Sequence, residues 1–371
     1  MKKKFLLISH SSGSGGAETI FLEVVKLLRT EEIIISLPKK KGFLYEKLKD
    51  EKIIILKNFT IYGNLYRMIV KFFLRDIFYI NDLFKYIKLI KKNRINVIYS
   101  SSVTNIQGAI LSIILKKKHI WHIHEITNSN LNWFDKKFDI LYKFFFNKAE
   151  LIFISKEVLE SWSKRLEIDK NNLRYKVIKN PVKIKWNNEI KKKTKKTNEI
   201  KIGFLGSNDT NKNLILLINS FKKLLLINSS LKLILVGKNM KDLEKEFKDI
   251  AKVKYELFDY KEAESFYKEI DIVVVPSLNE SWSLVAVEAM ALNIPVILTK
   301  ETTLINYLKD EENVLLINPN SENELLEKLI KLIENYEYYY KKFKKNNKLF
   351  FKNNKFNINF MKKINKIFLN K

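Results

Sequence analysis

Buried-strand and amphipathic-helix patterns alternate along almost the whole chain, and this alternation limits the possible folds more than any other feature. Short apolar runs rich in Ile, Val and Leu predict strands, and apolar residues three and four positions apart predict helices. Alternation of this kind is typical of parallel sheets wrapped by helices. In the first half we expect strands at residues 5–9, 33–37, 53–56, 97–100, 119–124 and 151–155, and helices at 17–28 and 106–115.

Residues 183–199 interrupt the alternation. This segment is polar and rich in lysine, so we interpret it as a linker. A second series follows, with strands predicted at 200–205, 231–236, 272–275, 295–299 and 314–317, and helices at 213–226, 262–267, 281–292 and 322–337. Because one domain takes about 100–200 residues, the 371 residues of the chain predict two domains.

We therefore predict an α/β protein with two doubly wound, Rossmann-like domains that face each other across a cleft. The first domain covers residues 1–182 and the second covers 200–345. Residues 346–371 form a C-terminal tail, for which we consider a helix that packs back on the first domain. Ligands of such sheets bind outside the carboxyl ends of the strands.

Charge and cysteine content narrow the choice of partners. The 69 basic and 41 acidic residues give a net charge of +28, which attracts anions such as phosphorylated substrates, anionic lipid headgroups and nucleic acid. The chain has no cysteine and four histidines, which leaves little room for a metal centre. The first apolar run ends at Ile8, too early for a signal peptide, and we find no apolar run of about 20 residues. We expect a cytoplasmic protein, and we also consider peripheral contact with the inner face of the cytoplasmic membrane.

Residues 276–297 carry the most specific functional signal. Glu280 follows a predicted buried strand, and Glu288 lies eight residues later. Eight helical residues rotate the chain by about 800° and rise about 12 Å, which would turn both carboxylates toward one side of the helix. Free amides at the helix start, residues 281–284, would suit a phosphate. The alternative is a structural helix with one exposed glutamate and one in its favourable first turn.

This segment resembles the signature of retaining glycosyltransferases of family 4, which have the two-domain GT-B fold. The resemblance places Glu280 at the donor sugar and Glu288 on the ribose hydroxyls of the nucleotide. Asn293 is a departure, because the family usually has Gly there. The resemblance further implies that backbone amides hold the diphosphate, namely those of Ser281, Trp282, Ser283 and Leu284.

Two glycines and one lysine extend the resemblance in the second domain. Gly206 ends a predicted strand and Lys212 follows six residues later, as in the family element whose two cations stabilise the departing nucleotide. Ser207 stands where Arg is usual and Asn213 where Gly is usual, which leaves Lys212 as the clear cation of that pair. Gly237, at the end of another predicted strand, resembles the glycine of the family's loop near the nucleotide base. The alternative for Lys212 is an ordinary surface lysine.

In the first domain, Gly15 and Gly16 lie in the loop after the first predicted strand and precede Ala17 and Glu18. This sequence resembles the Gly-Gly-Ala-Glu loop at the cleft edge of family 4 enzymes, where the glycines approach the donor phosphate or the acceptor. A plain turn is the alternative.

His122 and His124 alternate along a predicted strand and therefore share one face. His124 directly precedes Glu125, which resembles the family's His–acidic element, in which the histidine hydrogen-bonds the donor sugar. We prefer His124 for this role, with His122 second, and expect no metal here. A buried, hydrogen-bonded histidine without a functional role is the alternative.

Residues 64–95 and 131–148 mix aromatic, aliphatic and basic side chains at helical spacing. A basic amphipathic helix can lie in an anionic membrane interface, and family 4 enzymes commonly act on lipid-linked acceptors. The alternative is a helix whose apolar face packs on the core and whose basic face is solvated.

The resemblance therefore implies a metal-independent, hexosyltransferase-type enzyme that moves a sugar from a nucleotide-sugar to an acceptor hydroxyl with retention of configuration. Glu280, His124 and Lys212 are the expected catalytic residues. The first domain would bind the acceptor and the second the nucleotide-sugar, with no other cofactor. A lipid-linked or polysaccharide precursor of the bacterial envelope, such as lipopolysaccharide, is the expected acceptor.

Three other functions compete with this one. The first is a GT-B epimerase or hydrolase of nucleotide-sugars, and the second is a non-catalytic partner subunit, suggested by Ser207 and Asn293. The third is a nucleic-acid-binding protein, suggested by charge and aromatic content. We disfavour specific nucleic-acid binding because the basic residues are dispersed and no recognition motif is present.

Overall fold

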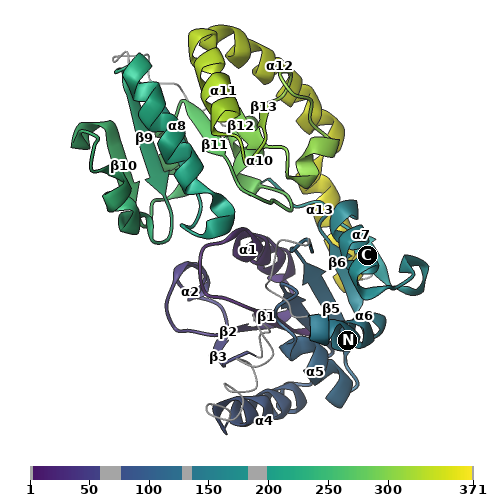
Figure 1. Cartoon of the computed structure of the whole chain (residues 1–371). Helices are drawn as coiled ribbons and strands as arrows, with labels where there is room; N and C mark the ends of the chain where they lie inside the picture. The colour runs from purple at the N-terminus through teal and green to yellow at the C-terminus, as the bar shows by residue number, and fades with distance from the viewer. Residues whose placement is uncertain (1–2, 59–76, 128–135, 183–198, 370–371) are drawn as a thin grey trace. The chain divides into compact units, whose positions relative to one another are not determined.

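The computed structural model describes residues 3–58, 77–127, 136–182 and 199–369 (Figure 1). The chain divides into two compact units. Unit 1 consists of Met1–Pro181 and Asn357–Lys371, and unit 2 of Val182–Phe356. The segment predicted as a linker lies almost wholly outside the described residues, as do parts of both basic aromatic segments.

Unit 1 is built on a parallel sheet of seven strands in the order β3-β2-β1-β4-β5-β6-β7. The strands are β1 (Lys4–Ser9), β2 (Glu32–Leu37), β3 (Ile53–Ile55), β4 (Val97–Ser101), β5 (Lys118–Ile123), β6 (Glu150–Phe153) and β7 (Tyr175–Val177). The helices are α1 (Gly16–Leu28), α2 (Phe43–Leu48), α4 (Ile77–Lys92), α5 (Gln107–Ile114), α6 (Asp139–Lys148), α7 (Lys156–Leu166) and α13 (Phe356–Leu369), with short 3-10 turns at Lys136–Phe138 and Lys170–Asn172.

Unit 2 repeats this plan with six parallel strands in the order β10-β9-β8-β11-β12-β13. The strands are β8 (Ile200–Leu205), β9 (Leu231–Val236), β10 (Tyr255–Phe258), β11 (Ile272–Val275), β12 (Val296–Thr299) and β13 (Leu315–Ile317). The α-helices are α8 (Leu214–Ile227), α9 (Ala263–Glu269), α10 (Leu284–Ala291), α11 (Glu322–Glu334) and α12 (Tyr336–Asn354). The 3-10 segments are η3 (Thr210–Lys212), η4 (Met240–Phe247), η5 (Lys252–Lys254) and η6 (Thr303–Asn306).

The central strands read as continuous apolar runs because helices cover both faces of each sheet. Phe5 to Ile8 of β1 and Ile272 to Val274 of β11 are fully buried. The predicted α/β fold with two doubly wound sheets is thereby confirmed. The sequence analysis missed β7 and β10, which are short, only partly buried edge strands.

The end of the chain differs from its prediction. The helix expected at residues 322–337 ends at Glu334, and α12 and α13 follow it. Lys355, with φ of +45°, turns the chain between these two helices. The far end of α13 packs within unit 1, where the Phe368 ring lies 5.8 Å from that of Phe5 and 5.4 Å from that of Tyr99.

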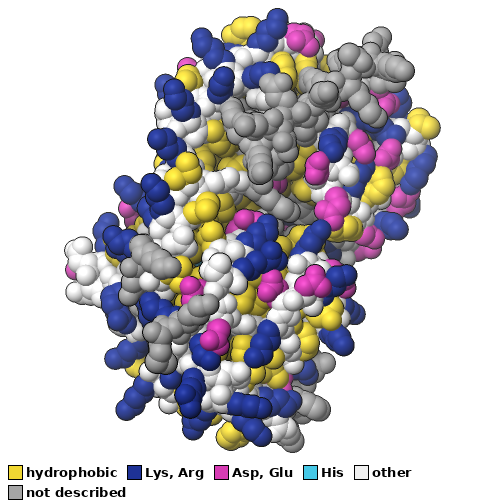
Figure 2. Space-filling model, turned by 180° about the vertical axis from the view of Figure 1, so that it is seen from behind, with side chains coloured by type: hydrophobic (Ala, Val, Ile, Leu, Met, Phe, Trp, Pro, Cys, Tyr) yellow, Lys and Arg dark blue, Asp and Glu magenta, His cyan; other side chains and the backbone are white. Residues whose placement is uncertain are grey.

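Two surface properties bear on partners. Among the described residues, no helix combines the length and the apolar character needed to cross a bilayer. Figure 2 shows lysine and arginine side chains scattered over the visible face rather than gathered into one patch. Basic side chains spread over a surface in this way attract anions in general.

Candidate functional site

Each sheet reverses its strand order at one place, and ligands of doubly wound sheets bind there, outside the carboxyl ends of the strands. In unit 2 the reversal lies between β8 and β11, and in unit 1 between β1 and β4. The predicted site residues fall into two groups at these places. We describe them as the unit 2 site and the unit 1 site.

An ion pair forms the centre of the unit 2 site. Lys212, after β8, places its Nζ 2.5 Å from Oε1 of Glu280, after β11. The Ser277 hydroxyl donates to the same oxygen at 2.9 Å. Burial on its own lowers the pKa of Lys212, but the charge and hydrogen bond of Glu280, with the charge of Asp209, raise it above the ordinary value. Lys212 is therefore a permanent cation held beside a carboxylate.

The backbone around Glu280 corrects one prediction. Helix α10 begins at Leu284 rather than at Ser281. Glu280 instead forms a parallel bridge with Thr302, and its N–H donates to the Glu301 carbonyl at 2.8 Å. The argument that eight helical residues align the carboxylates of Glu280 and Glu288 is therefore wrong, because Glu280 is not on the helix. The hydrophobic pattern predicted a helix that begins too early, because such a pattern carries no information about the left-handed backbone at Ser283.

Ser283 caps α10 with φ of +47°, and its hydroxyl accepts from the Ala286 N–H at 3.4 Å. Trp282 points into the core of unit 2, where its ring lies 5.9 Å from Tyr307 and 5.8 Å from Phe356. Ser281 is fixed by its carbonyl, which accepts from the Thr303 hydroxyl. Residues 281–284 can thus serve a ligand chiefly through backbone amides at the start of the helix.

Glu288, within α10, is 7% exposed. The Tyr267 hydroxyl of α9 donates to its Oε2 at 2.9 Å. Burial, and then the negative charge of Glu288, raise the pKa of Tyr267 well above its ordinary range. Tyr267 therefore stays protonated and holds the carboxylate in one orientation. Sequence reasoning missed Tyr267, because nothing in the order of residues couples α9 to α10.

Gly206 and Gly237 bring two loops into contact. A Cβ atom on Gly237 would lie 1.6 Å from the Gly206 carbonyl oxygen, and Gly237 has φ of +141°. Glycine is therefore required at 237 for both space and backbone conformation.

Asn213 and Asn293 stand where the family pattern has Gly, and both keep a backbone conformation that glycine favours. Asn213 has φ of +54° and Asn293 has φ of +61°, both left-handed values that glycine favours and asparagine tolerates. Asn213 also donates to the carbonyls of Pro276 and Pro319, at 3.2 and 2.7 Å. Ser207 is a chemical departure, because it supplies no charge and its hydroxyl donates to Asp209.

The unit 1 site contains the two predicted histidines. The rings of His122 and His124 lie 4.2 Å apart, so the two side chains do share one face of β5. His122 bonds the Tyr99 hydroxyl at 3.0 Å, and His124 bonds Ser101 at 3.3 Å. Burial lowers the pKa of His122 to about 3 and, with the influence of His122, holds that of His124 well below its usual range. Both are therefore neutral hydrogen-bonding groups near pH 7.

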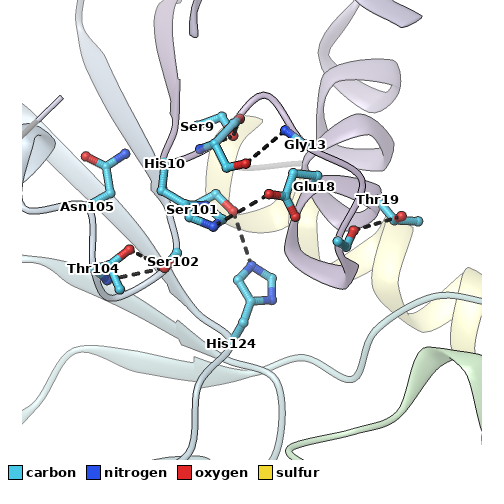
Figure 3. Close-up of polar contacts among 12 residues, drawn as sticks. Ser9, His10, Gly13, Glu18, Thr19, Ser101, Ser102, Thr104, Asn105 and His124 are labelled. Carbon is cyan, nitrogen blue, oxygen red and sulfur yellow. Dashed lines mark hydrogen bonds and ion pairs between the residues drawn. The ribbon is translucent and has the colours of Figure 1, made fainter. Parts of the chain in front are cut away.

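Two residues that sequence reasoning did not select, His10 and Glu18, flank the glycine loop (Figure 3). Gly15 caps α1 and Gly16 begins it. Glu18, in the first turn of the helix, is 5% exposed, and one of its oxygens lies 3.6 Å from Nε2 of His10. The signal that could have identified them is their position: His10 directly follows the first strand, and Glu18 follows the glycines.

Glu125 stabilises the local backbone through hydrogen bonds. It accepts from the Ser102 hydroxyl and from the backbone N–H groups of Val103 and His124, the latter two at 3.0 and 3.1 Å. It fixes the turn after β4 against the end of β5. Across the described ranges, no three His, Asp or Glu side chains come together as a metal-binding group.

Comparison with known proteins relates the second half of the chain to glycosyltransferases. Residues 186–350 match the family model for glycosyl transferases group 1, a segment that contains the unit 2 site. An uncharacterized glycosyltransferase of Methanocaldococcus jannaschii is 41% identical over 78 residues, which is 21% of this chain and 22% of that protein. The chain thus aligns with about a fifth of the length of this curated relative.

Solved structures resemble the chain along nearly its full length. Anabaena HepE in complex with UDP-glucose has a TM-score of 0.76 at 18% identity, covering 98% of this chain and 97% of that one. A glycosyltransferase from Rickettsia africae gives 0.74 at 17% identity, covering 99% and 100%. WaaG, a glycosyltransferase involved in lipopolysaccharide biosynthesis, gives 0.69 at 12% identity, covering 98% and 99%. The chain therefore has the GT-B fold, and its second unit matches a glycosyltransferase domain.

Proposed function

We propose that this protein is a retaining glycosyltransferase of family 4, which moves a sugar from a nucleotide-sugar to an acceptor hydroxyl. The observation that carries the proposal is the Lys212–Glu280 pair, 2.5 Å apart at the strand reversal of unit 2 and next to the start of α10. A nucleotide-sugar needs a cation and amides for its diphosphate and a carboxylate for its sugar. The match to a glycosyltransferase domain over the same residues supports this assignment.

In the proposed reaction, the bond between the anomeric carbon and the diphosphate oxygen breaks, and a bond to the acceptor oxygen forms. Negative charge builds on the departing diphosphate, which Lys212 and the amides of residues 281–284 would stabilise. Glu280 would orient the sugar and stabilise its cationic ring. The departing phosphate would take the proton of the acceptor hydroxyl, so the step needs no separate protein base.

Glu288 would bind the ribose hydroxyls. Its burial and its bond from Tyr267 at 2.9 Å fix a carboxylate that can accept hydrogen bonds from a diol. Gly206 and Gly237 would let the nucleotide approach the backbone. HepE, which shares the fold, is solved with UDP-glucose, and this supports a nucleotide-sugar as the donor here.

In unit 1, His124 would hydrogen-bond the donor sugar as a neutral imidazole, consistent with its lowered pKa. Gly15 and Gly16 would approach the acceptor or the donor phosphate. We propose that no metal or other cofactor takes part, because Lys212 and the helix amides meet the charge of the diphosphate.

The proposed acceptor is a lipid-linked or polysaccharide precursor of the bacterial envelope, used at the inner face of the cytoplasmic membrane. The fold neighbour WaaG is involved in lipopolysaccharide biosynthesis, which supports this context. Helix α6 exposes Ile140 by 83% and Phe144 by 49%, beside Lys143 and Lys148. Apolar and basic groups on one short helix suit an anionic membrane surface.

A donor screen tests the proposal. The full-length protein is mixed with UDP-, GDP-, dTDP- and CMP-sugars, and binding is followed by thermal shift and saturation-transfer NMR. We expect one nucleotide to bind selectively and Glu288→Gln to lose that binding, while the exposed-site control Glu264→Gln keeps it. Turnover should survive EDTA, and the anomeric coupling constant of the product should match that of the donor. Failure of the folded protein to bind any nucleotide-sugar would contradict the proposal.

The bond from Ser207 to Asp209 favours a second candidate, a non-catalytic subunit. It places a carboxylate where the family usually has a cation. Binding of a donor without transfer to any acceptor or to water would favour this candidate. Release of free sugar or of an epimer without an acceptor would instead favour a hydrolase or an epimerase.

A further inference from the structure

The indole ring of Trp282 is held in place by aromatic packing. The residue is 1% exposed, yet its Nε1–H has no hydrogen-bond partner among the described residues. Its ring instead meets the ring of Tyr307 at 5.9 Å and that of Phe356 at 5.8 Å, with interplanar angles of 65° and 69°. Edge-to-face pairs of this kind have a preferred geometry. Because no hydrogen bond fixes the indole, its orientation depends on these two neighbours.

The backbone of Trp282 belongs to the segment that we assign to the donor diphosphate. Ser281, before it, is tied through its carbonyl to the Thr303 hydroxyl, and Ser283, after it, has the left-handed φ of +47°. The rotamer of a side chain depends on the dihedral angles of its own backbone. A change in the orientation of the buried indole would therefore change the direction of the amides around it.

Phe356 lies where the chain passes from unit 2 to unit 1. Unit 2 ends at this residue, and the last segment of unit 1 begins at Asn357. Phe356 is 4% exposed, and its ring lies 5.5 Å from that of Phe350 and 5.9 Å from that of Phe351, at the end of α12. Directly before it, Lys355 turns the chain with φ of +45°. These contacts fix Phe356, so that it can hold the indole of Trp282 in turn.

We propose that Phe356 is a positioning residue for the donor diphosphate. Through its contact with Trp282, it keeps the amides of residues 281–284 pointed at the ligand. Donors that are already oriented stabilise developing charge better than donors that must first turn. This inference deepens the proposed function, on which it rests for the identification of the ligand as a nucleoside diphosphate.

This role differs from that of an ordinary core aromatic in what its loss should change. Loss of a core ring lowers the stability of the whole unit and treats all ligands alike. Loss of the Phe356 ring should act on the amides of residues 281–284, and hence on the phosphates of a ligand. The part of the nucleotide that Glu288 would bind should be unaffected.

Fluorine NMR and saturation-transfer NMR on the full-length protein test this difference. In protein labelled with 5-fluorotryptophan, the signal of Trp282 is the one of five that is missing in Trp282→Phe. The probes are inorganic pyrophosphate, UDP, GDP and dTDP, each diphosphate compared with its nucleoside. We expect pyrophosphate and at least one nucleotide to shift the Trp282 signal, and nucleosides to leave it unchanged.

Phe356→Leu should weaken the binding of pyrophosphate and of that nucleotide about tenfold, because the amides are no longer preorganised, and should change nucleoside binding by less than about twofold. Phe343→Leu is the matched control. Phe343 is 2% exposed on the same helix that leads to Phe356, and its ring lies 5.3 Å from that of Tyr339. This control should lose comparable stability and keep all affinities.

Three results would overturn the inference. They are unchanged binding of pyrophosphate and nucleotide in Phe356→Leu, an equal loss for nucleotide and nucleoside, and the same selective loss in Phe343→Leu. Should Phe356→Leu fail to fold, Phe356→Met keeps more of the volume and is compared in the same way.

Pyrophosphate separates this inference from the proposed function, because it needs no nucleotide site. If no nucleotide binds, while pyrophosphate shifts Trp282 and binds more weakly to Phe356→Leu, the proposed function fails and the role of Phe356 stands. If a nucleotide binds equally well to Phe356→Leu and to the unchanged protein, the reverse holds.

Discussion

The ammonium group of Lys212 and the carboxylate of Glu280 form an ion pair of 2.5 Å between the loops after β8 and β11. The charge and hydrogen bond of Glu280 raise the pKa of Lys212 and keep its ammonium group charged. A diphosphate that reached Lys212 would share its charge, and Glu280 could then turn toward the sugar. In the proposed reaction, the pair would therefore link binding of the leaving group to the position of the carboxylate.

Replacement of Lys212 by Met should lower the turnover number about 10²–10³-fold, because one group that stabilises developing charge is lost. Steady-state kinetics with the donor from the screen checks this. Lys222→Met is the control, since Lys222 lies on neighbouring α8 and makes a 3.8 Å ion pair with Asp249. Turnover in Lys212→Met within threefold of the unchanged protein would show that Lys212 has no part in the reaction.

Tyr267→Phe should weaken nucleotide binding about fivefold, because it removes one hydrogen bond worth about 1 kcal/mol from the Glu288 carboxylate. Glu288→Gln should weaken it more, since it changes the group that would touch the ribose. Calorimetric titration with the nucleotide gives both values. Tyr260→Phe, which removes an exposed bond to Glu262, should leave the affinity unchanged. Equal affinities in all variants would show that Glu288 does not bind the nucleotide.

Much of this arrangement could be predicted from the sequence, because buried parallel strands and their order of appearance leave local signals. The strands that precede Lys212, Glu280 and His124 are predicted to within one residue of their observed ends. Helix starts were harder, since the left-handed turn at Ser283 depends on its surroundings. The bond from Tyr267 to Glu288 joins separate elements, so no local pattern contains it.

The contact between Glu18 and His10 shows the same limit. Each residue stands at a predictable place, one after the first strand and one in the first turn of the next helix. Their pairing depends on how the glycine loop folds back, which the sequence alone leaves open.

The backbone at Asn293 gives a prediction that involves stability alone. Its φ of +61° suits Gly and Asn, whereas Ala is strained there. Its side-chain oxygen is buried without a hydrogen-bond partner in the described structure, so its loss should cost little. Asn293→Gly should therefore keep the stability, and Asn293→Ala should lose about 1 kcal/mol. Thermal unfolding of the two variants, each the control of the other, checks this, and equal melting temperatures would contradict it.

The buried histidines of β5 should make the protein less stable in mild acid. Burial lowers the pKa of His119 from 6.5 to about 3. Below pH 6.5 the unfolded chain takes up a proton at this residue that the folded chain does not. The free energy of unfolding should therefore fall as the pH drops from about 6.5 toward 3, by about 1.4 kcal/mol per pH unit for each such histidine.

Substitution of one histidine isolates this effect from the titration of the carboxylates. In His119→Gln, the fall in the free energy of unfolding between pH 6 and pH 4.5 should be smaller by about 1.4 kcal/mol per pH unit. Urea unfolding can be followed through the fluorescence of the five tryptophans, one of which, Trp121, has its ring 5.4 Å from that of His119. Ring NMR supplies the control, since the His119 resonance should not titrate above pH 5 in the folded protein. A normal titration near pH 6.5, with no change in the pH dependence, would show that this histidine reaches solvent.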